Sequence, residues 1–398
     1  SPRRRLHWLL LAFAPSSLML GVTTHLSMDL VAVPLLWIVP LAVYLLTFIL
    51  AFAGRPLIPA ALLSRLQVFA VLGVLLVLVS HASEPLWFVA GLHLFALFTL
   101  GLTCHGVLAR DRPGVSHLTE FYVWVAAGGA LGGAFNALVA PLVFNSVAEY
   151  PLALVIACLL APMWPTRRSS RKIPDPLPVD GEASPARGTA RPGSLGRDLV
   201  VALTFTASVI AVIFLVRAFG HDWLRAEYVL LVALLCFPLF ALRQRPVRFA
   251  LALGGVVLLS PLASDSDRST LHAERSFFGI HRVQTVRVPE GLMHRLVHGT
   301  TLHGMQWVEP ERCDEPLSYY HRAGPAGQVF ATFGRAPRAE NIGVVGLGTG
   351  ALSAYAEPGQ RWTYFEIDPA VVRIASNTDW FCYLGSSPVA PRVLLGDA

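Results

Sequence analysis

The hydrophobic positions of this chain change character at about residue 263. Before it, apolar residues form runs of about 20 positions, the length that an α-helix needs to cross the hydrocarbon core of a bilayer. A further run, 149–164, is only marginally long and carries proline near both ends. We therefore expect a polytopic membrane domain over residues 1–263, with eight or nine helices. Its spans are expected at 6–26, 31–52, 66–83, 86–108, 119–144, 198–219, 226–242 and 247–263.

After residue 263 the apolar segments are short, as in a soluble α/β domain. Alternating apolar positions at 285–288 and 294–297, with Pro289-Glu290-Gly291 between them, predict a β-hairpin. Later short apolar segments, separated by a glycine-rich turn and polar residues, predict the strands of a doubly wound sheet. We expect a β-hairpin lid over 264–335 and the start of the sheet over 336–398.

The composition agrees with this division. The 398 residues are 54% hydrophobic and only 14% charged, whereas soluble domains carry about 25% charged residues. Residues 165–197 are rich in Pro, Arg, Ser and Gly, so we expect a flexible loop there that divides the membrane domain. The net charge of +6 fits contact with anionic lipid headgroups, and no basic stripe with interleaved aromatic residues indicates nucleic-acid binding.

Basic residues cluster at the ends of the apolar runs, and such clusters favour the cytoplasmic side of a membrane. The clusters are Arg3 to Arg5, Arg55 with Arg65, Arg110 with Arg112, the group Arg167, Arg168, Arg171 and Lys172, and Arg243, Arg245 and Arg248. Nine spans leave the soluble domain outside, whereas eight bring it inside. The number of spans therefore decides the side on which the soluble domain lies.

The cysteines give no sign of a shared site. The five are Cys104, Cys158, Cys236, Cys313 and Cys382. They have no close spacing, and three of them lie in apolar runs, where a free cysteine behaves as a small hydrophobic residue. We expect neither a disulfide nor a metal site.

Two features of the membrane runs have both a structural and a functional interpretation. Small residues at 128–134 let helices approach closely in lipid, and the alternative is a hinge for transport. Most polar residues lie near the ends of runs, where their side chains reach the interface. His93 and Asn136 lie deeper, and they are candidates for a substrate or proton pathway.

The C-terminal residues carry a nucleoside-binding pattern. A short apolar strand leads into the glycine turn 346–350, the next strand ends in Glu366, and a third is followed by Asp397. Glycines let the backbone turn sharply and approach a nucleoside closely. A carboxylate at the tip of the neighbouring strand accepts hydrogen bonds from the ribose hydroxyls. The order of these features predicts a Rossmann-like nucleoside-binding domain.

Four segments of the soluble part resemble the spermidine synthase (polyamine aminopropyltransferase) family, specifically the bacterial membrane proteins in which such a domain is fused to a multi-span, transporter-like region. The segments are 276–283, 298–306, 315–321 and 325–330. The membrane part is similar in character, notably at 15–24 and 33–37. The resemblance implies a β lid and a Rossmann-like sheet of the S-adenosylmethionine-methyltransferase type. It also implies binding of decarboxylated S-adenosylmethionine and transfer of its aminopropyl group to a diamine or polyamine, in a bacterial inner-membrane protein. Because such a nucleoside cofactor is made in the cytosol, we expect a cytoplasmic soluble domain and one short segment that does not cross.

The resemblance assigns residues to two subsites. The donor would be bound by Gly346, Gly348, Thr349 and Gly350 in the turn, by Glu366 at the ribose and by Asp397 beside the adenine. The acceptor site would be shaped by Gln306, Tyr320 and His321. From the residues alone, Gln306 also fits a strand cap, and Tyr320 also fits a core aromatic with a bonded hydroxyl.

The chain departs from the family pattern at positions that matter for catalysis. Thr349 replaces the aspartate that grips the cationic amino group of the donor, and His303 replaces the aspartate of the family's Asp-Gly-x-x-Gln stretch. The glutamine often found after the family's first lid strand corresponds to Gly279 or a neighbour. The family's general base, an aspartate, lies one strand beyond Asp397. We expect a sequence that is incomplete at both ends, since it begins at Ser1 and stops before that base, and a natural truncation is the alternative.

Three classes of function remain open. The first is aminopropyl transfer, with methyl transfer from S-adenosylmethionine as a variant. The second is a catalytically inactive, synthase-like membrane subunit with a structural or interaction role in a larger complex. The third is transport of a polyamine or another solute. Besides the lipid bilayer, the expected partners are further copies of the chain or other membrane subunits.

Overall fold

The computed structural model describes most of the chain, which divides into two compact units. The described residues are 1–30, 35–53, 58–80, 82–161, 193–218, 236–263, 269–299, 301–334 and 339–397. One unit comprises Ser1–Ser27, Ala32–Ala140 and Val147–Ala263, and the other comprises Met28–Val31, Pro141–Ser146 and Ser264–Ala398. We call the helices of residues 1–263 the helical bundle, and we call residues 264–398 the C-terminal domain.

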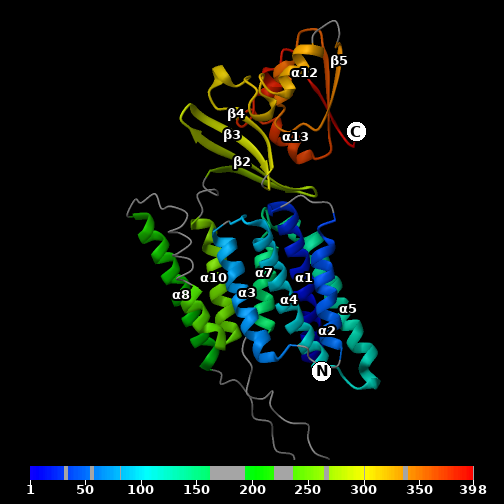
Figure 1. Cartoon of the computed structure of the whole chain (residues 1–398), viewed down its shortest axis with the longest axis vertical. Helices are drawn as coiled ribbons and strands as arrows, with labels where there is room; N and C mark the ends of the chain where they lie inside the picture. The colour runs from blue at the N-terminus through cyan, green and yellow to red at the C-terminus, as the bar shows by residue number, and fades with distance from the viewer. Residues whose placement is uncertain are drawn as a thin grey trace, which may run out of the picture. The chain divides into compact units, whose positions relative to one another are not determined.

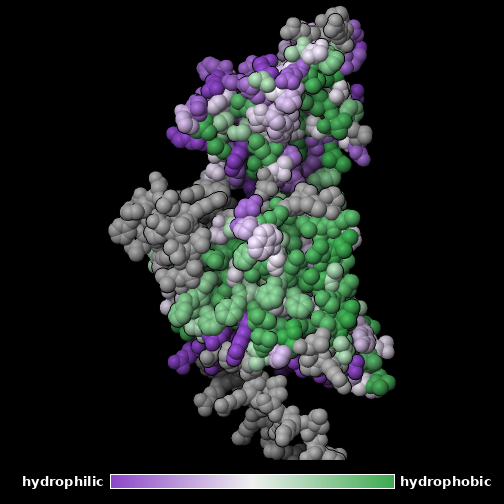
Figure 2. Space-filling model, viewed as in Figure 1, coloured by the Kyte–Doolittle hydropathy of each residue, from purple (hydrophilic) through white to green (hydrophobic). Residues whose placement is uncertain are grey.

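The helical bundle consists of apolar helices that pack side by side (Figure 1). They are α1 (Pro2–His25), α2 (Ile38–Phe52), α3 (Ala60–Ser80), α4 (Leu86–Arg110), α5 (Leu118–Ala134), α6 (Ala140–Val143), α7 (Glu149–Leu160), α8 (Gly193–Ala218) and α10 (Pro246–Ala263). Single 3₁₀ or π turns lie at Leu26–Leu30, Val115–His117, Phe135–Val139 and Leu242–Gln244. The side wall seen in Figure 2 is hydrophobic, as expected of a surface that faces lipid.

Among the described residues, four helical segments are long and apolar enough to cross a membrane. They are Pro2–Met28, Ala60–Ser80, Leu86–Arg110 and Val115–Val143. Shorter apolar helical stretches are α2, α7 and the part Pro246–Leu258 of α10. Membrane association is therefore supported, whereas the predicted total of eight or nine spans is matched only in part. Two predicted segments lie mostly outside the described residues, namely the run at 226–242 and the loop at 165–197. Arg55 and the basic group at 167–172 also lie outside them. The last residues of the predicted loop, 193–197, begin α8.

Close packing between α1 and α5 explains the small residues at 128–134. A Cβ atom added at Gly128 would lie 2.3 Å from the carbonyl oxygen of Leu9, and one at Gly132 would lie 2.7 Å from that of Phe13. The Ser16 hydroxyl on α1 donates a hydrogen bond to the Gly129 carbonyl at 2.8 Å. These contacts favour the packing interpretation of this segment over a transport hinge.

The C-terminal domain contains an antiparallel and a parallel sheet. The antiparallel sheet has the order β1 (Thr270–Ser276), β2 (Gly279–Val288), β3 (Gly291–His298) and β4 (Thr301–Trp307). The predicted hairpin is its β2–β3 pair, in which Val288 pairs with Gly291. The parallel sheet has the order β5 (Asn341–Val345), β6 (Arg361–Glu366) and β7 (Arg392–Leu395). Short helices include α12 (Pro325–Phe333), α13 (Pro369–Ala375) and α14 (Tyr383–Ser386), and 3₁₀ turns lie at Pro310–Arg312, Ser318–Tyr320 and Ala351–Tyr355.

Helix α13 lies between the two sheets and joins their cores. Val371 and Ala375 pack with Trp362 and Tyr364 of the parallel sheet. Ile374, on another face of the helix, packs with Val283 and Leu296 of the antiparallel sheet. Because one helix fills both interfaces, the two sheets form one domain.

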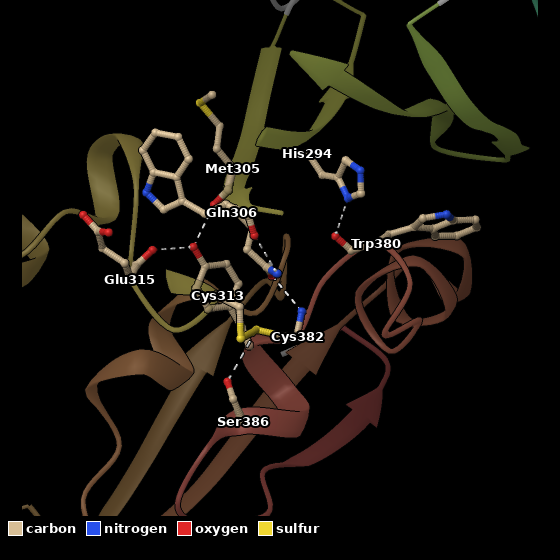
Figure 3. Close-up of a disulfide and its surroundings, with 10 residues drawn as sticks. His294, Met305, Gln306, Cys313, Glu315, Trp380, Cys382 and Ser386 are labelled. Carbon is tan, nitrogen blue, oxygen red and sulfur yellow. Dashed lines mark hydrogen bonds between the residues drawn. A yellow bond between two sulfur atoms is a disulfide. The ribbon is translucent and has the colours of Figure 1, made fainter. Parts of the chain in front are cut away.

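A disulfide joins Cys313 to Cys382, so the prediction of no disulfide was wrong. The two residues are 69 positions apart in sequence, and their Cα atoms lie 6.1 Å apart. Cys313 follows the 3₁₀ turn after β4, and Cys382 precedes α14 (Figure 3). The pairing depends on how these two segments meet in the fold, and sequence spacing carries no signal of it.

Candidate functional site

The glycine turn follows β5 and needs glycine at three positions. Gly346, Gly348 and Gly350 have φ values of 86°, 57° and 78°, a region that residues with a Cβ atom rarely adopt. A Cβ atom at Gly348 would lie 2.8 Å from the His303 carbonyl oxygen. The Gly346 amide donates a hydrogen bond to the Phe365 carbonyl at 2.8 Å, which fixes the turn beside the end of β6.

Glu366 ends β6 and holds the turn in place. Its side chain is buried, and the Leu347 amide donates to its Oε2 atom at 2.8 Å. The Asp368 amide donates to the Oε1 atom at 2.9 Å. Glu366, which is predicted to bind a ribose, therefore also fixes the backbone of the glycine turn at Leu347 and the backbone after β6 at Asp368. A carboxylate has about four acceptor positions, so two remain for a ligand.

A cavity of about 280 Å³ opens beside this turn. It brings together four of the predicted site residues, namely Gly346, Gly348, Glu366 and Tyr320. The remaining lining residues are Phe278, His281, Leu296, His303, Val345, Ile367, Asp368 and Val371. The antiparallel sheet and the parallel sheet thus both contribute walls. Burial raises the pKa of the Tyr320 phenol, so this side chain is neutral at physiological pH.

His281 and Asp368 form a buried pair in the cavity wall that was not predicted. The His281 Nε2 atom lies 2.7 Å from Asp368 Oδ2, and the Ser276 hydroxyl donates to the same oxygen at 2.5 Å. The Ala370 amide donates to Asp368 Oδ1 at 2.8 Å, so Asp368 also caps α13. Burial acts to raise the pKa of Asp368, but the hydrogen bonds from Ser276, Ala370 and His281 outweigh it and lower the pKa. An Asp directly before a Pro is a helix-start signal, whereas nothing in the sequence indicates its histidine partner.

His303 stands where the resemblance implies an aspartate. It lines the cavity, and burial lowers its pKa. The nearby His281 lowers it further, and Glu366 partly opposes the shift. The imidazole is therefore neutral at physiological pH and gives the cavity a hydrogen-bonding group without a negative charge.

Thr349 does not line the cavity. Its side chain is fully buried, and its hydroxyl has no hydrogen-bond partner among the described residues. A Cβ atom added at Gly304 would lie 2.2 Å from this hydroxyl, so Thr349 packs against the backbone of β4. Thr349, where the resemblance implies a cation-binding aspartate, thus makes a packing contact between the glycine turn and β4.

Three other predicted residues also lie outside the cavity lining. Gln306 is buried and accepts a hydrogen bond from the Cys382 amide at 2.7 Å, which ties β4 to the disulfide-bonded segment (Figure 3). His321 is exposed, and its Nδ1 atom accepts from the Ala323 amide at 3.1 Å within a turn. Asp397 is exposed beyond β7. The third turn glycine, Gly350, does not line the cavity, and a Cβ atom added there would lie 2.9 Å from Leu384.

The deeper polar residues of the bundle bond to other helices. His93 Nδ1 lies 2.5 Å from the Tyr150 hydroxyl. The Asn136 amide donates to the Ser17 hydroxyl at 2.7 Å and to the Gly132 carbonyl at 2.9 Å. Within the described part of the chain, neither His93 nor Asn136 lines the cavity beside the glycine turn or the apolar pocket beside α3. A search for groups of three or more His, Cys, Asp or Glu side chains able to hold a metal finds none among the described residues.

No protein-family model, no curated protein and no solved structure matches this chain.

Proposed function

We propose that the C-terminal domain is a Rossmann-like, spermidine-synthase-like domain that binds a nucleoside thioether. The proposed reaction transfers an aminopropyl group from decarboxylated S-adenosylmethionine to a diamine or polyamine, in a protein of the bacterial inner membrane. The observation that carries the proposal is the shared cavity, because it is lined by Gly346, Gly348 and Glu366, which are predicted to bind the donor, and by Tyr320, which is predicted to shape the acceptor site.

The cavity offers suitable groups for a nucleoside. Glycines at 346 and 348 leave the backbone accessible, and a Cβ atom at Gly346 would meet no atom within 4 Å, so this side of the turn is open. The free acceptor positions of Glu366 suit two ribose hydroxyls. Val345 and Ile367, both largely exposed, flank the turn and provide apolar surface for a purine ring.

Calorimetric titration of the detergent-solubilised full chain tests this proposal. The three ligands are methylthioadenosine, decarboxylated S-adenosylmethionine and S-adenosylmethionine. We expect methylthioadenosine and the decarboxylated donor to bind. A preference for S-adenosylmethionine would indicate methyl transfer instead, and no binding by any of the three would contradict a nucleoside site.

A second candidate is a catalytically inactive, synthase-like membrane subunit with a structural or interaction role. Thr349 favours it, because this buried neutral side chain faces Gly304 and leaves no carboxylate for the cationic end of the donor. A turnover assay separates the two candidates. If the full chain binds methylthioadenosine but releases none from decarboxylated donor and diamine, the second candidate is supported, whereas release of methylthioadenosine with an aminopropylated amine supports the first.

A further inference from the structure

We infer that the C-terminal domain lies on the extracytoplasmic side of the membrane, in an oxidising compartment. This assignment reverses the cytoplasmic placement expected from the source of the cofactor. Two independent observations carry it: the direction of α10 relative to the basic residues of the bundle, and the state of the cysteines. Neither depends on the number of spans or on the residues between α7 and α8.

The starts of α1 and α5 and the end of α4 lie at one end of the bundle. Arg4, at the start of α1, forms an ion pair with Asp111 directly after α4, with an Nη2–Oδ1 distance of 2.9 Å. The Trp8 indole donates to the same carboxylate at 2.6 Å. Arg5 forms an ion pair with Glu120 in the first turn of α5. Helix α4 therefore runs antiparallel to α1 and α5.

The starts of α3, α8 and α10 lie at this same end. The hydroxyl of Thr103, late in α4, donates to Gln67, early in α3, at 2.7 Å. Arg65 and Arg243 line one pocket, which places the residues before α10 beside the start of α3. Asp198, in the first turns of α8, forms ion pairs with Arg245 and Arg248 at the start of α10.

Basic residues gather at this end, where Figure 2 shows hydrophilic side chains along the lower edge of the bundle. They are Arg3, Arg4 and Arg5 in α1, Arg65 in α3, Arg110 and Arg112 at the end of α4, Arg197 in α8, and Arg243, Arg245 and Arg248 around the start of α10. The segments 26–37, 81–85 and 144–148, which follow α1, α3 and α6, contain no lysine or arginine, whereas the last turn of α8 and the sequence after it contain two, Arg217 and Arg225. Such asymmetry places the basic end in the cytoplasm.

Helix α10 therefore leads the chain out of the cytoplasm. It begins at Pro246, at the basic end, and its 18 residues rise about 27 Å, close to the thickness of a hydrocarbon core. It ends at Ala263, and β1 begins at Thr270, so only a short connection separates the helix from the C-terminal domain. Chain connectivity then places this domain on the side opposite to the arginines.

The cysteines support the same side. Cys313 and Cys382 are the only cysteines of the sequence after residue 264, and they form a disulfide with each other. Cys104, Cys158 and Cys236, all in the bundle, are free. Disulfides persist in oxidising compartments and are rare in the reducing cytosol. The distribution matches a C-terminal domain that is exported and a bundle that stays in the membrane.

Single cysteines placed at two exposed positions test the inference in intact cells with a permeabilised outer membrane. Glu290→Cys lies in the exposed β2–β3 turn, and Val115→Cys, at a position 91% exposed, follows α4 at the basic end. A membrane-impermeant sulfonated maleimide is expected to label Glu290→Cys before lysis and Val115→Cys only after lysis. Labelling in the reverse order would overturn the inference.

Two further measurements on the full chain do not depend on these variants. Alkaline phosphatase, which is active only when exported, is expected to be active when fused after Ala398, and an inactive fusion made at the same level would contradict the assignment. In acid-trapped wild-type protein, Cys313 and Cys382 are expected to react with maleimide only after reduction. If both react before reduction, the disulfide does not support the assignment and the oxidising compartment is excluded.

Discussion

Ionisation of Asp368, in the cavity wall, makes the stability of the fold depend on pH. Its pKa is lowered because hydrogen bonds from Ser276, Ala370 and His281 outweigh the effect of burial. Its ionised form thus stabilises the folded domain above the ordinary carboxyl pKa of about 4. This contribution is lost as the pH falls through the lowered folded-state pKa.

Asp368→Asn is therefore expected to make the free energy of unfolding depend less on pH in the acid range. Guanidinium unfolding of the full chain in detergent, followed by tryptophan fluorescence, measures the free energy of unfolding between about pH 5 and pH 2. The wild type is expected to lose more of this free energy than the variant over that range. Equal losses would show that Asp368 is not held in its ionised form.

Thr349 provides a second test at the scale of one residue. Its buried hydroxyl has no partner among the described residues, so Thr349→Val is expected to change the free energy of unfolding by less than about 1 kcal/mol. Thr349→Asp restores the family residue but buries a charge beside Gly304, at an expected cost of more than about 3 kcal/mol. Chemical unfolding of both variants measures these changes. A stable Thr349→Asp variant that binds decarboxylated donor more tightly would show that this position is open to the donor.

At the scale of elements, the α1–α5 interface has an internal control. A Cβ atom at Gly132 would lie 2.7 Å from the Phe13 carbonyl oxygen, whereas the nearest atom to one at Gly133 is 3.9 Å away. Both substitutions to alanine gain the same helix propensity. We expect Gly132→Ala to lower the free energy of unfolding by about 1–3 kcal/mol and Gly133→Ala to leave it unchanged or slightly higher. Thermal unfolding in detergent distinguishes them, and equal effects would contradict the packing.

The elements that sequence predicted are those whose signal is local. The β2–β3 hairpin follows from alternation on either side of Gly291, and the turn at Gly346 follows from glycines between two strands. The hydrogen bond of Gln306 to the Cys382 segment and the packing of Thr349 against β4 were not predictable, because each depends on which segment the side chain faces in the fold. The Cys313–Cys382 pair and the His281–Asp368 pair join residues far apart in sequence, so only the fold brings them together.

At the scale of the whole molecule, the side of the membrane constrains the function. A domain outside the cytoplasm meets a nucleoside only if that ligand is exported or comes from the surroundings. The inferred orientation therefore favours the inactive-subunit candidate over transfer from a donor made in the cytosol. If the donor is exported, this orientation is compatible with the enzymatic candidate. The result of the turnover assay does not depend on the side of the membrane on which the domain lies.

The most direct test of the central claim compares two glycine substitutions in a methylthioadenosine titration. Gly346 and Gly359 have similar φ values, 86° and 91°, and a Cβ atom at either would meet no atom within 4 Å. The backbone strain of substitution is thus matched, but only Gly346 lines the cavity. We expect Gly346→Ala to weaken methylthioadenosine binding at least about tenfold, or about 1.4 kcal/mol, and Gly359→Ala to bind like the wild type. Equal affinity of the two variants, or no binding by the wild type, would contradict a nucleoside site at this turn.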